Sequence, residues 1–166
     1  MKSVILVILG VSVSLGAPPV HPKDSLPVTE ALVDQWTKDW QDRLDLRDWQ
    51  ITTQIVRISE LKPDTLGNLR WDNKNRTANI RVMNPQDYTL PASQIQRDIE
   101  YTIVHELVHL QLAALPRDPN GKAVEERVVN KIASALFRLE KGVNYPPHSG
   151  VERGPMKPAA EASRSR

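Results

Sequence analysis

Residues 102–112 read TIVHELVHLQL, and the rest of the chain is best understood outward from this stretch. His105 and His109 are four residues apart, so on a helix both imidazoles lie on one face, one turn apart. Glu106 lies about 100 degrees further round the same helix. The residues between them are almost all apolar, which is typical of a helix buried in a core. The stretch therefore predicts a buried helix that presents two histidines and a carboxylate.

The HExxH spacing of this stretch is unlikely to arise by chance. The chain has 4 His among 166 residues, and roughly 0.005 of chains with this composition would contain the pattern at random. The alternative is an ordinary helix with two surface histidines. Imidazoles have little reason to lie in so apolar a segment unless they bind something, so the pattern favours a metal site.

The pattern suits zinc chemistry. Zinc bonds histidine nitrogen at about 2.0–2.1 Å, a distance that His105 and His109 can satisfy together. Zinc also lowers the pKa of a water that it binds towards about 7. Glu106 is placed to accept the proton of that water and later to protonate a leaving amine. The spacing therefore predicts His105 and His109 as metal ligands and Glu106 as the catalytic base.

A catalytic zinc usually takes three protein ligands, so a third is needed. Asp118 lies in a loop and His148 lies beside two prolines, and both are weak candidates. Glu125 and Glu126 open a later helical segment. In steps of about 100 degrees per residue, Glu125 lies nearer the centre of that helix's apolar face. Only Glu126 has an amide side chain, Asn130, four residues on.

The segments VHELVHLQL (104–112) and ERVVNKIA (126–133) resemble the gluzincin metallopeptidases. In that family the HExxH helix is followed by a second helix that carries a glutamate ligand. The resemblance covers roughly residues 95–141 and implies Glu126 as the third ligand, with Asn130 supporting a metal histidine. Glu125 would then only complement the helix dipole at the N-terminus.

The segments before the motif predict a small α+β domain. Apolar residues recur at three- and four-residue steps from Thr29 to Leu46, which predicts an amphipathic helix whose tryptophans pack in the core. From Trp49 to Ile55 the apolar residues alternate, as in a half-buried strand. Residues 66–71 and 77–83 flank the turn-forming sequence DNKN, which predicts a hairpin. Such a sheet suits the upper part of a zincin-like fold.

The two helices of the motif also have sequence signals at their ends. Ser93 is a candidate N-cap for a site helix that runs to about Leu115, before Pro116. A last helix is expected from Lys122 to Lys141, with Gly142 as its stop. Its expected apolar positions are Val124, Val128, Ile132, Leu136 and Leu139.

The resemblance has two further implications. In zincins the edge strand above the site helix often pairs with an extended substrate, and Thr77–Met83 is the candidate for that strand. Acyl chemistry also needs an oxyanion stabiliser. Tyr101, Tyr145 and His148 are candidates, and none of them is assigned.

The ends of the chain predict secretion. Residues 1–16 have the charge, apolar run and small residues of a cleavable signal peptide, and the run is too short for a stable membrane anchor. Residues 17–27 read as a proline-rich linker, 28–142 as the metallopeptidase domain and 143–166 as a disordered tail. We expect a secreted or periplasmic protein.

Composition narrows the function. The chain has no cysteine, which excludes thiolate metal ligands and disulfides. A net charge of +2 without long runs of one sign does not indicate a nucleic-acid partner. The sequence therefore predicts a secreted Zn²⁺-dependent metallopeptidase acting on a peptide or protein substrate. The alternative is a zinc-binding, zincin-like module without proteolytic activity.

Overall fold

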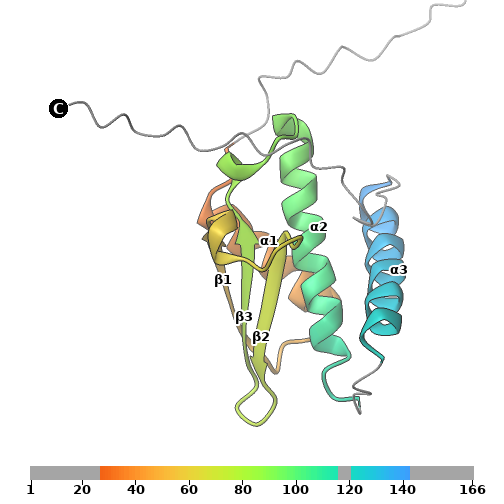
Figure 1. Ribbon diagram of the computed structural model, residues 1–166. Helices are drawn as coiled ribbons and strands as arrows, with labels where there is room; N and C mark the ends of the chain where they lie inside the picture. The colour runs from red at the N-terminus through yellow and green to blue at the C-terminus, as the bar shows by residue number, and fades with distance from the viewer. Residues whose placement is uncertain (1–26, 116–120, 143–166) are drawn as a thin grey trace, which may run out of the picture.

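The computed structural model describes residues 27–115 and 121–142. Within them an N-terminal helix is followed by a three-stranded sheet and then by two packed helices (Figure 1). This arrangement confirms the α+β class. The elements are α1 (Glu30–Arg43), β1 (Gln50–Val56), β2 (Gly67–Asp72), β3 (Thr77–Met83), α2 (Ala92–Gln111) and α3 (Lys122–Lys141), with short 3-10 turns at Ile58–Glu60 and Pro85–Asp87.

The sheet has the strand order β1-β3-β2, with β1 parallel and β2 antiparallel to β3. The expected hairpin is confirmed, and its turn is closed by Asp72, whose Oδ1 accepts the backbone N–H groups of Lys74 and Asn75. The expectation that Thr77–Met83 is the edge strand is wrong. β1 pairs with the side of β3 that the hairpin leaves open, so β3 is central and β2 is the edge strand beside α2.

The sheet has one apolar and one polar face, as its alternation predicts. On β3, Ala78, Ile80 and Val82 are buried, while Thr77 is exposed on the opposite face. Both α1 and α2 pack against the sheet and against each other. Figure 1 shows α2 between the sheet and α3. The site helix is therefore the central element of the fold.

Aromatic side chains join the three helices. Trp40 of α1 is 2% exposed and stacks on Phe137 of α3, with ring centroids 6.4 Å apart. Tyr101 of α2 meets the same Phe137 edge to face at 5.7 Å. Such pairs stabilise a core beyond their buried area. The expectation that the tryptophans of α1 serve core packing holds for Trp40.

Helix α2 begins and ends slightly differently from the expectation. Its N-cap is Pro91, which makes no side-chain capping bond, and Ser93 lies inside the first turn. The helix ends at Gln111, and residues 112–115 form a turn. Among the described residues, no helix combines the length and apolar character needed to cross a bilayer.

Helix α3 has the predicted bounds, and Gly142 ends it with a left-handed φ of 66°, a conformation that glycine adopts without strain. The five apolar positions whose periodicity indicated this helix are mostly not the residues that it buries. Val124, Val128, Ile132 and Leu139 are exposed, and the buried residues are Val129, Ala133 and Phe137. The helix has two apolar stripes, and periodicity does not say which of them contacts α2.

Candidate metal site

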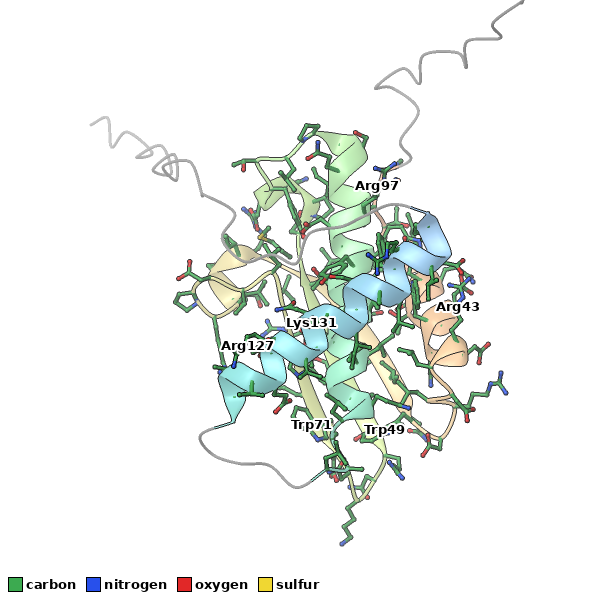
Figure 2. All side chains as sticks on the ribbon, turned by 90° about the vertical axis from the view of Figure 1, so that its right-hand side faces the viewer. Arg43, Trp49, Trp71, Arg97, Arg127 and Lys131 are labelled. Carbon is green, nitrogen blue, oxygen red and sulfur yellow. The ribbon has the colours of Figure 1, made fainter. Side chains whose placement is uncertain are left out.

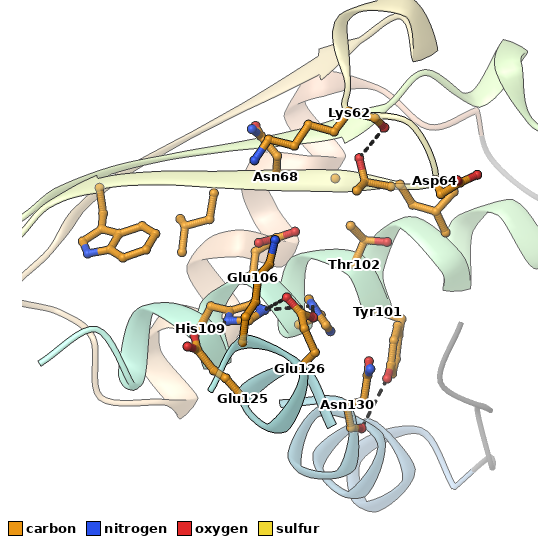
Figure 3. Close-up of a pocket in the computed structure, with 17 residues that line it drawn as sticks. Lys62, Asp64, Asn68, Tyr101, Thr102, Glu106, His109, Glu125, Glu126 and Asn130 are labelled. Atoms are coloured by element: carbon orange, nitrogen blue, oxygen red, sulfur yellow. Dashed lines mark hydrogen bonds and ion pairs between the residues drawn. The ribbon is translucent and has the colours of Figure 1, made fainter. Parts of the chain in front are cut away.

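The candidate site lies where the C-terminal half of α2 faces the first turn of α3 (Figure 3). α2 contributes His105, Glu106 and His109, and α3 contributes Glu125 and Glu126. The C-terminal part of α2 lies beside the first turn of α3, as the contacts of His109 with Glu125 and Glu126 show. The helix pair thus brings together side chains that are some 20 residues apart in the sequence.

Three of these side chains form a group that could hold a metal ion: His105, His109 and Glu126. The Nε2 atoms of the two histidines are 3.1 Å apart. Oε2 of Glu126 lies 3.5 Å from Nε2 of His105, and Oε1 of Glu126 lies 3.4 Å from Nε2 of His109. Ligands at 2.0–2.1 Å from a tetrahedral zinc ion are about 3.3–3.4 Å from one another. Each of these separations is close to that value, and one ligand atom from each of the three residues lies within 4.8 Å of the other two. The group is therefore compact enough to share one ion.

Glu125 lies on the other side of the same imidazole. Its Oε1 is 3.0 Å from Nδ1 of His109. Nε2 of the same ring is the atom that lies beside His105 and Glu126. Nδ1–H therefore donates to the Glu125 carboxylate and leaves Nε2 free to bind a metal. The expectation that Glu125 would only complement the helix dipole is thus incomplete, because its carboxylate also orients His109.

Glu106 is buried but is not a member of the ligand group. Its side chain is close to β2, since a Cβ added at Gly67 would lie 3.4 Å from Glu106 Oε1. Burial raises the pKa of the Glu106 carboxyl, and the two histidines only partly oppose this shift. A carboxyl with a raised pKa is suited to exchanging protons near neutral pH.

The electrostatics of the site favour a cation between the histidines and the carboxylates. The pKa of the Glu126 carboxyl is well below its ordinary value because His105, and then His109, hydrogen-bond to it. Burial opposes a charge on His109, yet hydrogen bonds to Glu126 and Glu125 outweigh burial and raise the pKa of its imidazole. Three carboxylates around two imidazoles therefore attract positive charge, which a proton or a metal ion can supply.

A cavity of about 640 Å³ opens onto these groups between the edge strand β2 and the two helices. Gly67 lets β2 approach α2 closely, because a Cβ there would lie only 2.5 Å from Thr102 Cγ2. Leu69 and Trp71 of β2 also line the cavity. Lys62 and Asp64, from the segment before this strand, line it as well (Figure 3). The candidate site is thus reached through a cleft large enough for a peptide side chain.

The other predicted site residues behave differently. Among the described residues, no hydrogen bond joins the Asn130 side chain to either histidine. The backbone carbonyl of Asn130 accepts the Tyr101 hydroxyl at 3.4 Å. The expected support of a metal histidine by Asn130 is therefore wrong in this geometry, and Glu125 has that position. Tyr101 also bonds Ser134 at 3.0 Å and packs in the core. Asp118, Tyr145 and His148 lie outside the described residues.

Sequence reasoning missed two features of the site. The first is the use of both glutamates: adjacent helix residues differ by about 100 degrees, so Glu125 and Glu126 reach different nitrogens of His109. The adjacency of two glutamates was the available signal. The second is Gly67, whose role depends on the contact between β2 and α2 and has no local sequence signal.

No protein-family model, curated protein or solved structure matches this chain. The group of His105, His109 and Glu126 on two packed helices is consistent with an HExxH metal site. The resemblance to gluzincins therefore depends on the residues and their geometry alone.

Proposed function

We propose that this protein is a zinc-dependent metallopeptidase that hydrolyses peptide bonds. The observation that carries the proposal is the convergence of His105, His109 and Glu126, whose ligand atoms, one from each residue, lie within 4.8 Å of one another. Two imidazoles and a carboxylate are the ligand set of a well-known class of catalytic zinc sites. With no cysteine in the chain, nitrogen and oxygen ligands are the available choice.

In this proposal His105, His109 and Glu126 hold Zn²⁺, and Glu125 keeps His109 in the tautomer that binds it. The ion, when bound, supplies Lewis-acid activation of water and of the scissile carbonyl. Glu106 accepts the proton of the attacking water. The same carboxyl then donates that proton to the leaving amine, so that Glu106 returns to its starting state.

The edge strand β2 supports a peptide as substrate. In its register with β3, Leu66 accepts the backbone N–H of Met83. The backbone groups of every second residue from Leu66 therefore point to β3, and those of Gly67, Leu69 and Trp71 point to the open edge. An extended peptide can pair with this edge by strand addition. The substrate strand is then β2, in place of Thr77–Met83.

We also propose that the protein is exported. The support is the sequence of residues 1–16, which has the pattern of a cleavable signal peptide. Secretion or transfer to a periplasm would place the enzyme with extracytoplasmic peptides or proteins. N-terminal sequencing of the protein from its native host tests this, and a start near Ala17 is expected.

Two measurements on the purified protein test the function. Elemental analysis should find about one zinc per chain, and His109→Ala should lose it. Incubation with a peptide library, followed by mass spectrometry, should show chelator-sensitive cleavage that Glu106→Gln abolishes. Zinc without cleavage of any peptide would favour the non-proteolytic zinc-binding module, and absence of zinc would contradict both.

A further inference from the structure

The outward face of α3 carries an apolar stripe that no described element covers. Val128 is 42% exposed, Ile132 38% and Leu139 83%, with Ala135 between them. Val124, 53% exposed, extends the stripe toward the N-terminus. Figure 2 shows this face of α3 turned toward the viewer, across α2. The stripe lies on the side of α3 opposite the buried Val129, Ala133 and Phe137.

The spacing of the stripe is that of a helix-packing seam. Val128, Ile132, Ala135 and Leu139 follow one another at steps of four, three and four residues, the repeat by which one helix packs along another. With Val124 the stripe is about 22 Å long at 1.5 Å per residue. The exposed members are all aliphatic, and an aliphatic seam with this repeat is typical of helix–helix contacts. The spacing therefore favours a helix as the occupant.

The charges beside the stripe indicate which charge the partner helix should carry. In steps of about 100 degrees, Arg127 and Lys131 lie along one flank of the stripe. The opposite flank turns toward the body of the protein, with Leu136 half-buried. In an antiparallel pair of two copies, the same basic flanks would face each other and repel. A partner helix with acidic residues beside its apolar seam would instead be attracted.

We propose that the outward face of α3 is a docking surface for an acidic amphipathic helix of another protein. The partner's apolar residues pack on Val128, Ile132 and Leu139, and its carboxylates lie along the basic flank of α3. This surface is separate from the metal cleft, so the proposal is independent of the proposed peptidase activity.

The experiment uses two synthetic 21-residue peptides as probes. Both have leucine at the seam positions of three heptads, and the flanking positions carry glutamate in one and lysine in the other. Fluorescence anisotropy with the full protein should show the glutamate peptide binding at least about tenfold more tightly than the lysine peptide. Ile132→Asp, which places a charge in the seam, should weaken binding of the glutamate peptide by at least about tenfold.

A matched control is Leu115→Asp, because Leu115 is an exposed leucine, 60% accessible, that lies just after α2. This variant should bind the glutamate peptide like the parent, and circular dichroism should show all variants folded. Lys131→Glu should reduce the preference for glutamate over lysine. Equal binding of the two peptides would overturn the proposal. So would self-association that Ile132→Asp abolishes, or adsorption to phosphatidylglycerol vesicles without preference between the peptides.

Discussion

Two buried glutamates on α2, Glu100 and Glu106, have opposite surroundings. Glu100 is 6% exposed and accepts the indole N–H of Trp40 at 3.0 Å. It also pairs with Lys141 of α3 at 2.8 Å. Glu106 is 8% exposed, and among the described residues it has no hydrogen-bond or ion-pair partner. It faces the cleft beside the candidate metal ligands instead.

The difference separates a carboxylate that has structural partners from one that is a candidate for chemistry. A buried charge normally has partners that repay its desolvation, and Glu100 follows this rule by joining all three helices. Glu106 does not, and its pKa is raised by burial. A buried titratable group without such partners, beside a cavity, is a candidate for a functional site. The same helix therefore joins the other two helices near its middle and presents the candidate metal ligands and Glu106 one to two turns later.

The largest expected effect comes from Glu106→Gln. The amide keeps the shape of the side chain but cannot accept a proton, so peptide hydrolysis should fall about 10²–10⁴-fold. Zinc content should stay that of the parent, because Glu106 is not a ligand. The free energy of unfolding should not fall, since a desolvated carboxyl is removed. Initial rates, elemental analysis and urea denaturation measure the three quantities, and retained hydrolysis would exclude Glu106 as the base.

The next effect concerns Glu125→Gln, which weakens the bond to Nδ1 of His109. Loss of such outer-shell support typically lowers metal affinity about 10–100-fold. Competition with a chromogenic zinc chelator measures the change. Glu140→Gln is the matched control, because Glu140 lies on the same helix and pairs with the distant Arg43. Equal zinc affinity in Glu125→Gln and the control would mean that Glu125 does not orient His109.

A third prediction concerns the close approach of β2 to α2. The new methyl group of Gly67→Ala would lie 2.5 Å from Thr102 Cγ2 and 2.9 Å from the Arg81 carbonyl oxygen. Overpacking of this kind costs about 1–3 kcal/mol of unfolding free energy, which urea denaturation measures. Adding Thr102→Ser removes Cγ2 but keeps the hydroxyl that donates to the Asp98 carbonyl. The double variant should recover part of the loss, and no recovery would place the clash elsewhere.

The smallest effect is expected for Glu100→Gln. The amide oxygen can still accept the Trp40 N–H, but the ion pair with Lys141, which is 35% exposed, is lost. Unfolding free energy should fall by about 1 kcal/mol, with peptide hydrolysis unchanged. A large fall in hydrolysis at full zinc content would contradict the division between the two glutamates.

Local sequence determined the motif and the types of the elements. The four-residue spacing of His105 and His109 places both rings on one helix face whatever the rest of the fold does. Alternation in 77–83 and the DNKN turn were sufficient for the hairpin, and Gly142 ends α3 where expected. These features depend on backbone geometry within a few residues. Such local geometry follows directly from the types of the amino acids in that stretch.

Tertiary structure alone decided three other matters. It made β3 central and β2 the edge, because β1 pairs with the far side of the hairpin. It chose which of the two apolar stripes of α3 contacts α2. It also placed Glu126 at the Nε2 atoms of the two histidines and Glu125 at Nδ1 of His109. Helix and strand periods say which side chains share a face, but the partner of each face depends on how all the elements compete to bury apolar surface.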